Sequence, residues 1–127
     1  METIRQTYHI SAPVAAVWQA LVDPAVIDGW GGGPAEMGEA VNFEFKLWGG
    51  DIHGRNIEVT PPKKLVQEWY GGDWAEPSFV TFELFEGKLG TRLELGQVNL
   101  PDEDAAEIDL GWKDFYLGPL KEMLENS

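Results

Sequence analysis

The stretch FEFKLWGGDIHGRNIEVT, residues 43–60, carries the pattern that decides the fold. Apolar and polar side chains alternate before Gly49-Gly50, which is the period of a strand with one buried face. The two adjacent glycines supply the positive φ angles that a tight turn between antiparallel strands needs. The stretch therefore predicts a β-hairpin that belongs to a sheet.

The same period of two recurs along the chain and predicts six or seven sequential antiparallel strands joined by short turns. The expected strands cover residues 2–10, 41–47, 52–59, 65–70, 80–84 and 91–97. A sheet of this kind buries one face, and a helix is expected to cover that face.

Helical spacing of apolar residues predicts two short helices, over about 13–21 and 24–29, and a long helix after Pro101. The long helix carries one apolar stripe, which consists of Ile108, Trp112, Tyr116, Leu120, Met123 and Leu124. Gly118-Pro119 interrupts this stripe and predicts a kink near the preceding turn. A long helix on an antiparallel sheet makes the fold class α+β.

The composition of the 127 residues predicts a single domain, residues 1–127, with its own apolar core. Nine basic against 22 acidic residues leave a net charge of −13, so neither a nucleic acid nor a membrane surface is expected as a partner. The sequence contains no cysteine, no secretory signal and no long apolar run, which together indicate a cytoplasmic location.

No motif predicts a catalytic residue, a metal site or a cofactor. His9 and His53 are far apart and belong to no metal-binding pattern, and no serine stands in a GxSxG motif. Six acidic residues lie within 102–114 but lack the spacing of an EF-hand loop. We expect them on the solvated outer face of the C-terminal helix, where those in its first turn also favour the helix dipole.

The register of the first hairpin places polar side chains on the apolar face of the sheet. A two-residue turn at residues 49–50 pairs Phe45 with Gly54. On this register, Asn56 and Glu58 share the face of Phe45. The apolar face of this hairpin is therefore expected to carry two polar side chains.

The next hairpin extends this polar group. If Thr60 pairs with Leu65, then Gln67 lies opposite Glu58, and Gln97 lies on the apolar face of its own strand. Burying an unpartnered carboxylate is costly, so these side chains predict a cavity with a polar lining. The alternative is a register shifted by one residue, which would place all of them outside.

Short motifs that belong together occur from about Ile4 to Leu124. They are Ser11-Ala12-Pro13, Val17-Trp18, Leu21, Asp23-Pro24 and Trp30, followed by residues 45–50, 54–56 and 61–66, Trp69, and residues 90–93 and 111–112. This set resembles the START-like (SRPBCC, helix-grip) superfamily, in the branch homologous to the C-terminal domain of the activator of the ninety-kilodalton heat-shock protein ATPase. The resemblance implies a curved sheet that grips the long helix, two short helices closing one end, and a hydrophobic cavity between them. The Gly118-Pro119 break departs from the uninterrupted helix of the family.

We interpret the chain as a non-catalytic binding module that holds a small, mostly apolar or amphipathic molecule between the sheet and the C-terminal helix. The expected site residues are Trp30 at the mouth, Trp69, Trp112 and Tyr116 in the walls, and Asn56, Glu58 and Gln67 as orienting polar groups.

Two other functions stay open. The resemblance implies a chaperone-linked or stress-related interaction protein with a heat-shock chaperone as partner, although ATPase stimulation in larger homologues uses a further N-terminal domain. The superfamily also includes cyclases and hydrolases, and Glu58 in a desolvated pocket would suit general acid or base chemistry.

Overall fold

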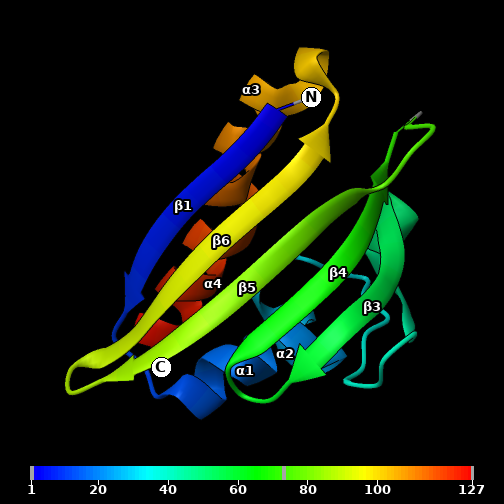
Figure 1. Ribbon diagram of the computed structural model, residues 1–127. Coiled ribbons are helices and arrows are strands. Elements are labelled where there is room, and N and C mark those ends of the chain that lie inside the picture. Colours follow the sequence, from blue (N-terminus) through cyan, green and yellow to red (C-terminus); the bar gives the residue numbers. More distant parts are fainter. Residues whose placement is uncertain (1, 73, 127) are drawn as a thin grey trace.

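The computed structural model describes residues 2–72 and 74–126, and it contains an antiparallel sheet with helices on one side (Figure 1). The strand order is β1-β6-β5-β4-β3-β2. The strands are β1 (Glu2–Ile10), β2 (Glu44–Leu47), β3 (Ile52–Thr60), β4 (Lys64–Gly71), β5 (Ser78–Gly87) and β6 (Gly90–Leu100). The predicted antiparallel arrangement is confirmed, but β2 is shorter than expected because residues 41–43 lie outside it.

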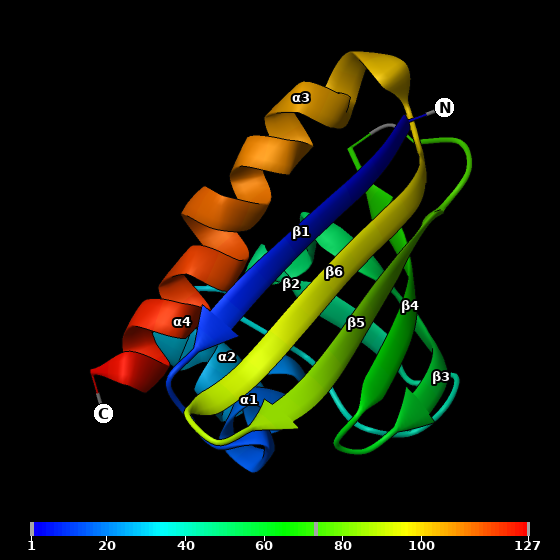
Figure 2. The ribbon, with the colours of Figure 1, turned by 60° about the vertical axis from the view of Figure 1, so that its left-hand side comes forward.

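The helices lie where the sequence predicts them, and the predicted long C-terminal helix consists of two α-helices and a π-helical turn. They are α1 (Val14–Val22), α2 (Pro24–Trp30), α3 (Asp102–Gly111) and α4 (Leu117–Glu125), with the π-helical turn η2 (Trp112–Tyr116) joining the last two. Figure 2 shows this long C-terminal helix lying along the inner side of the curved sheet, with α1 and α2 at one end. The α+β class and the helix-grip arrangement are confirmed.

One apolar interior lies between the sheet and the helices. Leu65 and Leu93 from the sheet, Leu21 from α1 and Leu120 from α4 are all fully buried. Each such side chain contributes about 1.5–3 kcal/mol relative to an exposed position. This interior holds the C-terminal helix against the sheet and thereby fixes the positions of its cavity-lining residues.

The C-terminal helix changes its hydrogen bonding just before Gly118-Pro119, where the sequence predicts a kink. The Leu117 N–H donates to the Trp112 carbonyl, which is the i→i+5 bond of a π-helical turn. Pro119 has no N–H to donate to the preceding turn. At Gly118, a Cβ atom would collide with the Lys113 carbonyl oxygen. The predicted irregularity therefore takes the form of a π-helical turn that requires glycine at position 118.

The first hairpin has the predicted register. Phe45 lies opposite Gly54, and Glu44 lies opposite Arg55. The chain turns through the 3-10 turn η1 (Trp48–Gly50), in which both glycines have the positive φ expected from the sequence. The local pattern of residues 43–56 was thus sufficient to predict this pairing.

The second hairpin departs from the predicted register along its whole length, because Gln67 lies opposite Asn56 and not opposite Glu58. Asn56 pairs with Gln67, whereas Glu58 pairs with Val66, so β3 contains one extra residue, Ile57. A bulge of this kind reverses the faces of the residues that follow it. The prediction that Glu58 lies on the inner face is therefore wrong.

Glu58 lies in solvent instead. Its side chain is 51% exposed, and its Oε2 is 3.7 Å from the Nζ of Lys64. Thr60 pairs with Lys64, not with Leu65, because the turn between the two strands contains three residues, 61–63, and not the predicted four. An exposed ion pair contributes only about 0–1 kcal/mol. Glu58 is thus removed from the candidate site, together with its suggested role as an acid or base.

Candidate ligand-binding cavity

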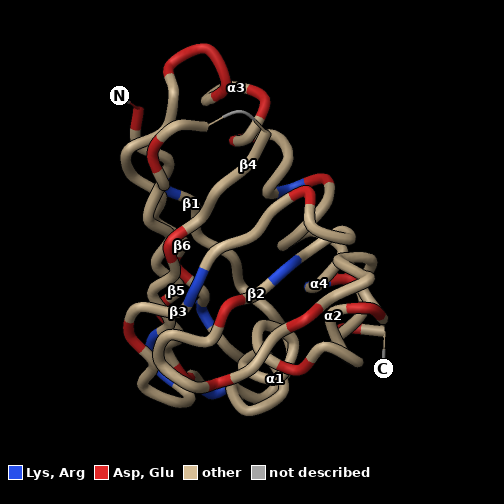
Figure 3. Tube along the Cα trace, turned by 90° about the vertical axis from the view of Figure 1, so that its right-hand side faces the viewer, with Lys and Arg blue, Asp and Glu red and all other residues tan. Residues whose placement is uncertain are grey.

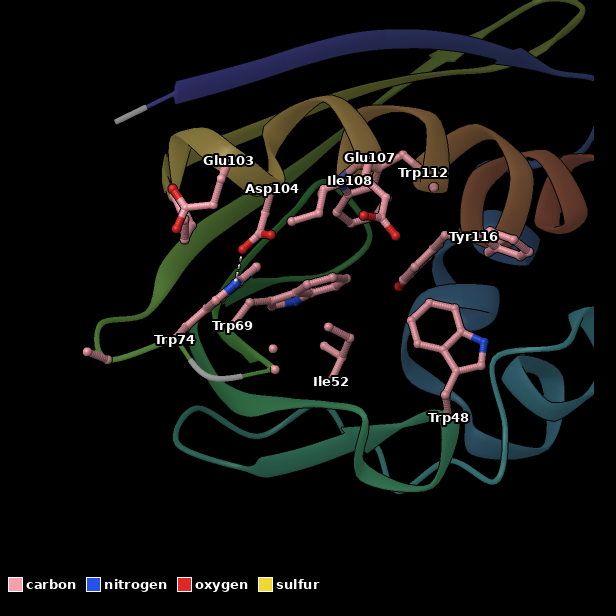
Figure 4. Close-up of a pocket in the computed structure, with 16 residues that line it drawn as sticks. Trp48, Ile52, Trp69, Trp74, Glu103, Asp104, Glu107, Ile108, Trp112 and Tyr116 are labelled. Carbon is pink, nitrogen blue, oxygen red and sulfur yellow. Dashed lines mark hydrogen bonds between the residues drawn. The ribbon is translucent and has the colours of Figure 1, made fainter.

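A cavity of about 880 Å³ lies between the C-terminal helix and the strands β3 and β4 (Figure 4). Six of its sixteen lining residues are aromatic, namely Trp48, Trp69, Trp74, Trp112, Phe115 and Tyr116. Phe115 is 66% exposed, so the cavity reaches the surface of the molecule. This volume falls within the range of small-molecule sites, about 300–1,000 Å³.

Three of the predicted site residues line this cavity together. Trp69 comes from β4, and Trp112 and Tyr116 come from η2. The ring centroids of Trp69 and Trp112 are 4.9 Å apart, and those of Trp112 and Tyr116 are 4.8 Å apart. The three rings therefore form one continuous wall, as the apolar stripe of the helix and the alternation of β4 predict.

Trp30 lies in the core behind this wall. It is only 5% exposed, and its ring centroid is 4.5 Å from that of Tyr116. Its indole N–H donates to the Ala20 carbonyl at 2.8 Å. The prediction that Trp30 stands at the mouth is wrong, because α2 packs against α4 and turns the indole inward.

Asn56 and Gln67 are fully buried on the inner face, as the register predicts, but they do not line the cavity. The Asn56 amide donates to the carbonyls of Gly38 and Ala40, and its Oδ1 accepts a 3.0 Å bond from Gln67. The side-chain Oε1 of Gln67 in turn accepts a hydrogen bond from the Trp69 indole N–H at 2.9 Å. These amides therefore anchor the loop around residue 38 and orient the Trp69 ring, so their contribution to the cavity is indirect.

Gln97 orients the Trp112 ring in the same way as Gln67 orients the Trp69 ring. It is fully buried, and its Oε1 accepts the Trp112 indole N–H at 2.7 Å. Its amide nitrogen donates to the Ser78 hydroxyl at 2.9 Å. Both indoles of the wall are thus held in place by an amide behind them.

The Tyr116 hydroxyl is the exception among the buried polar groups. Tyr116 is 1% exposed, and its hydroxyl has no hydrogen-bond partner within the part of the chain that the structure describes. Figure 4 shows the hydroxyl directed into the space between Trp69 and Trp48. Burial raises the pKa of this hydroxyl far above its ordinary value, so it stays protonated and can donate a hydrogen bond.

Three carboxylates of α3 stand at the edge of the cavity. Glu103, Asp104 and Glu107 all belong to its lining. Asp104 accepts the Trp74 indole N–H at 3.0 Å, which ties α3 to the segment after β4. The expectation that the acidic run lies only on the outer face of the helix is therefore wrong for these three residues.

Trp48, Trp74 and the three carboxylates were missed from the sequence. Asp104 continues the helical stripe of Ile108 and Trp112 one turn backward, so the spacing itself could have indicated its position. No comparable signal exists for Trp74, because its place depends on the contact with Asp104 thirty residues away.

Within residues 2–72 and 74–126, no three His, Asp or Glu side chains converge as metal ligands would. Among the helices of those residues, none has the length and apolar character needed to cross a bilayer. The cavity offers aromatic walls, one buried hydroxyl and an acidic edge.

Curated relatives of this chain carry the names of heat-shock protein ATPase activators. A Dictyostelium discoideum protein named activator of 90 kDa heat shock protein ATPase homolog is 32% identical over 82 residues, which cover 61% of this chain and 21% of that protein. The Mus musculus homolog 2 of this activator is 26% identical over 125 residues, which cover 97% of this chain and 35% of that protein. The chain thus spans about a third or less of the length of the curated relatives it matches.

The fold and a family comparison agree with these relatives. The crystal structure of an HSP90 activator from Plasmodium falciparum superposes with a TM-score of 0.90 at 27% identity, over 98% of this chain and 96% of that one. Residues 11–125 match the family described as Activator of Hsp90 ATPase homolog 1-like protein. The resemblance found in the sequence motifs is confirmed, and the chain belongs to the Activator of Hsp90 ATPase homolog 1-like family.

Proposed function

We propose that this chain binds a small, mostly apolar molecule in the cavity between the C-terminal helix and strands β3 and β4. The observation that carries the proposal is the Tyr116 hydroxyl, which is buried in an aromatic wall without a partner. An unsatisfied buried hydroxyl costs about 1–3 kcal/mol, and a ligand atom that accepts its hydrogen bond would recover that cost.

The indole groups support the same conclusion. Each of the six tryptophans donates its N–H to an acceptor within the chain, including Trp48, Trp69, Trp74 and Trp112 around the cavity. The rings of the wall are therefore fixed in orientation before any ligand arrives. Pre-organised apolar walls with few free polar groups are typical of small-molecule sites, because little ordering cost remains on binding.

The experiment is a thermal-shift and native mass-spectrometry screen with fatty acids, sterols, long-chain alcohols and amines, and aromatic polyketides. The matched variants are Gly111→Trp and Leu110→Trp on neighbouring positions of α3. Gly111 lines the cavity, has helical φ, and has no atom nearer than 3.9 Å to an added Cβ, so a large side chain enters the cavity without a backbone clash. Leu110 is 64% exposed and does not line it.

We expect at least one ligand class to raise the melting temperature of the wild-type protein and of Leu110→Trp. The same ligand should fail to do so with Gly111→Trp, because the indole occupies its place. If no class binds the wild-type protein, or if both variants bind equally well, the cavity is not the site and the proposal is wrong.

A chaperone-linked role is the second candidate, and the family membership favours it. The HSP90 activator from Plasmodium falciparum has nearly the same extent as this chain, which supports a partner interaction by a single domain in the cytoplasm. Leu110 and Phe115 supply exposed apolar surface on α3 and η2, and such surface often marks a protein contact.

A pull-down with the purified ninety-kilodalton chaperone, together with its ATPase rate, tests this role. We expect Leu110→Ser with Phe115→Ser to reduce capture, while Leu89→Ser, which removes a 93% exposed leucine from the turn between β5 and β6, leaves it unchanged. Absence of capture by the wild-type protein would count against a chaperone partner.

A further inference from the structure

We propose that the ligand of this cavity is an organic cation, an elongated apolar molecule whose amine or quaternary ammonium group lies at Glu103 and Glu107. This inference rests on the proposed function and names the chemical class of its ligand. Three features of the cavity carry it: the charge at its edge, the aromatic rings beside that charge, and the free Tyr116 hydroxyl.

The charge at the edge of the cavity has one sign. The described residues that line the cavity include Glu103, Asp104 and Glu107 but no Lys, Arg or His. In the part of the chain that the structure describes, neither Glu103 nor Glu107 takes part in an ion pair. Figure 3 shows acidic residues gathered where the chain enters α3. A cationic group at this edge would gain attraction from two carboxylates that no basic residue neutralises.

Asp104 has a different task from its neighbours. It accepts the Trp74 indole N–H at 3.0 Å and so holds the Trp74 ring at the edge of the cavity. Figure 4 shows Trp74 and Trp69 on the side of the space opposite α3. Aromatic faces attract cations, most strongly those of tryptophan. An ammonium group at this edge would therefore lie between carboxylates on one side and indoles on the other.

The Tyr116 hydroxyl is an independent sign of a ligand. It is 99% buried, has no hydrogen-bond partner among the described residues and points into the cavity. A molecule that fills the cavity can offer this hydroxyl an oxygen acceptor. The ligand thus has a charged end outside and room for a neutral polar atom inside.

The backbone positions of Glu107 and Tyr116 lie nine residues apart along the C-terminal helix, which runs along the cavity. At 1.5 Å of rise per residue this corresponds to roughly 13 Å. A decyl chain has a comparable length, so a decyl series is a suitable set of probes.

The first experiment compares decylammonium, decanol and decanoate by tryptophan fluorescence and calorimetry, each below the concentration at which it forms micelles. The three share one apolar body and differ only in the charge of the head. We expect decylammonium to bind about ten-fold more tightly than decanol, because two carboxylates attract its charge, and decanoate to bind most weakly. The preference should shrink when the salt concentration rises from 50 to 500 mM.

Two double variants separate a local effect from the general negative charge of the protein. Glu103→Gln with Glu107→Gln removes two charges at the cavity, and Glu86→Gln with Glu122→Gln removes two exposed charges elsewhere. We expect the first pair to lose most of the preference for decylammonium over decanol while keeping the affinity for decanol. The second pair should keep both.

An aminodecanol with its hydroxyl at the far end tests the inner contact. We expect it to bind about two- to ten-fold more tightly than decylammonium, the effect of one added hydrogen bond, and to lose this gain in Tyr116→Phe. No gain in the wild-type protein would remove Tyr116 from the proposed contact.

The outcomes are distinguishable. If none of the three decyl probes binds and the broader screen also yields no ligand, the proposed function itself fails. If decanol or decanoate binds as tightly as decylammonium, the function stands and the cationic ligand is wrong. If both double variants lose the preference equally, the attraction comes from the net charge, and the assignment to Glu103 and Glu107 is overturned.

Discussion

Two parts of the interior treat their buried polar groups in opposite ways. Behind the wall of the cavity, Asn56, Gln67 and Gln97 are fully buried, and each is hydrogen-bonded at both ends of its amide. In the wall itself, the Tyr116 hydroxyl is equally buried and has no partner. The three amides stabilise the fold through their hydrogen bonds. The Tyr116 hydroxyl still has a hydrogen bond to donate.

This difference changes the role of the residues that the sequence singled out. Asn56 and Gln67 were expected to orient a ligand, but their hydrogen-bonding capacity is used within the protein. The free group belongs to a residue expected only as an apolar wall. Burial alone therefore does not mark a candidate binding residue, and burial without a partner is the feature that sets Tyr116 apart.

The largest expected loss of stability comes from breaking the hydrogen-bonded amide network behind the wall. Gln67→Leu removes the acceptor of the Trp69 N–H and the donor to Asn56 Oδ1, and leaves both groups buried and unpaired. We expect a loss of about 2–4 kcal/mol in the free energy of unfolding, measured in urea. Gln19→Leu, an exposed position on α1, should change it by less than about 0.5 kcal/mol. An equally small loss for Gln67→Leu would show that the buried network is not structural.

The next effect concerns the backbone that presents Tyr116. Gly118→Ala places a Cβ atom against the Lys113 carbonyl oxygen and forces the π-helical turn to move. We expect a loss of about 1–3 kcal/mol, the usual cost of overpacking. Gly111→Ala lies in the same helix without such a contact and should raise stability by about 0.5–1 kcal/mol through helix propensity. Similar behaviour of the two variants in thermal melts would contradict this account of η2.

A smaller change in stability, of opposite sign, is expected when the Tyr116 hydroxyl is removed. Tyr116→Phe removes a buried hydroxyl that has no partner to lose, so the unfolding free energy should stay constant or rise by about 1 kcal/mol. The matched variant is Tyr8→Phe, which removes a hydroxyl hydrogen-bonded to Gln6 and should lower stability by about 0.5–1.5 kcal/mol. A clear loss in Tyr116→Phe would mean that its hydroxyl is bonded in solution.

The smallest effect lies outside the cavity, at the other end of the C-terminal helix. Hydrogen bonds from Lys121 and from the Ser11 backbone lower the pKa of Glu125 below its ordinary value of 4.5. Because this pKa is lowered, its stabilising contribution is present above pH 4.5 and is lost as the pH falls through the folded-state pKa.

We therefore expect Glu125→Gln to lower the melting temperature slightly at pH 7 and to leave it unchanged at a pH below the folded-state pKa. NMR titration of Glu125 in Lys121→Met should give a pKa closer to 4.5. A pKa that does not respond to this substitution would show that the pair with Lys121 does not form in solution.

Local patterns predicted most of the fold and part of the cavity. Alternation and helical spacing located the strands, the helices and three wall residues, Trp69, Trp112 and Tyr116, because both periods are properties of neighbouring residues. The glycines of the first turn fixed its register for the same reason. Glu58 and Trp30 were misplaced, since a bulge and the docking of α2 depend on contacts between distant segments.

The sequence by itself thus determined the family, the helix-grip architecture and the aromatic stripe that faces the sheet. Only the tertiary structure decided which buried polar groups have a hydrogen-bond partner within the protein and which do not. Apart from Trp69, which is two residues from Gln67 on β4, the partners of Gln67, Gln97 and Asp104 lie on other elements or loops, at sequence separations of 11, 15 and 30 residues or more, so no local pattern encodes them. Hydrogen bonding is directional and pairwise, and the single hydroxyl left over at Tyr116 becomes visible once every such pair has been placed in space.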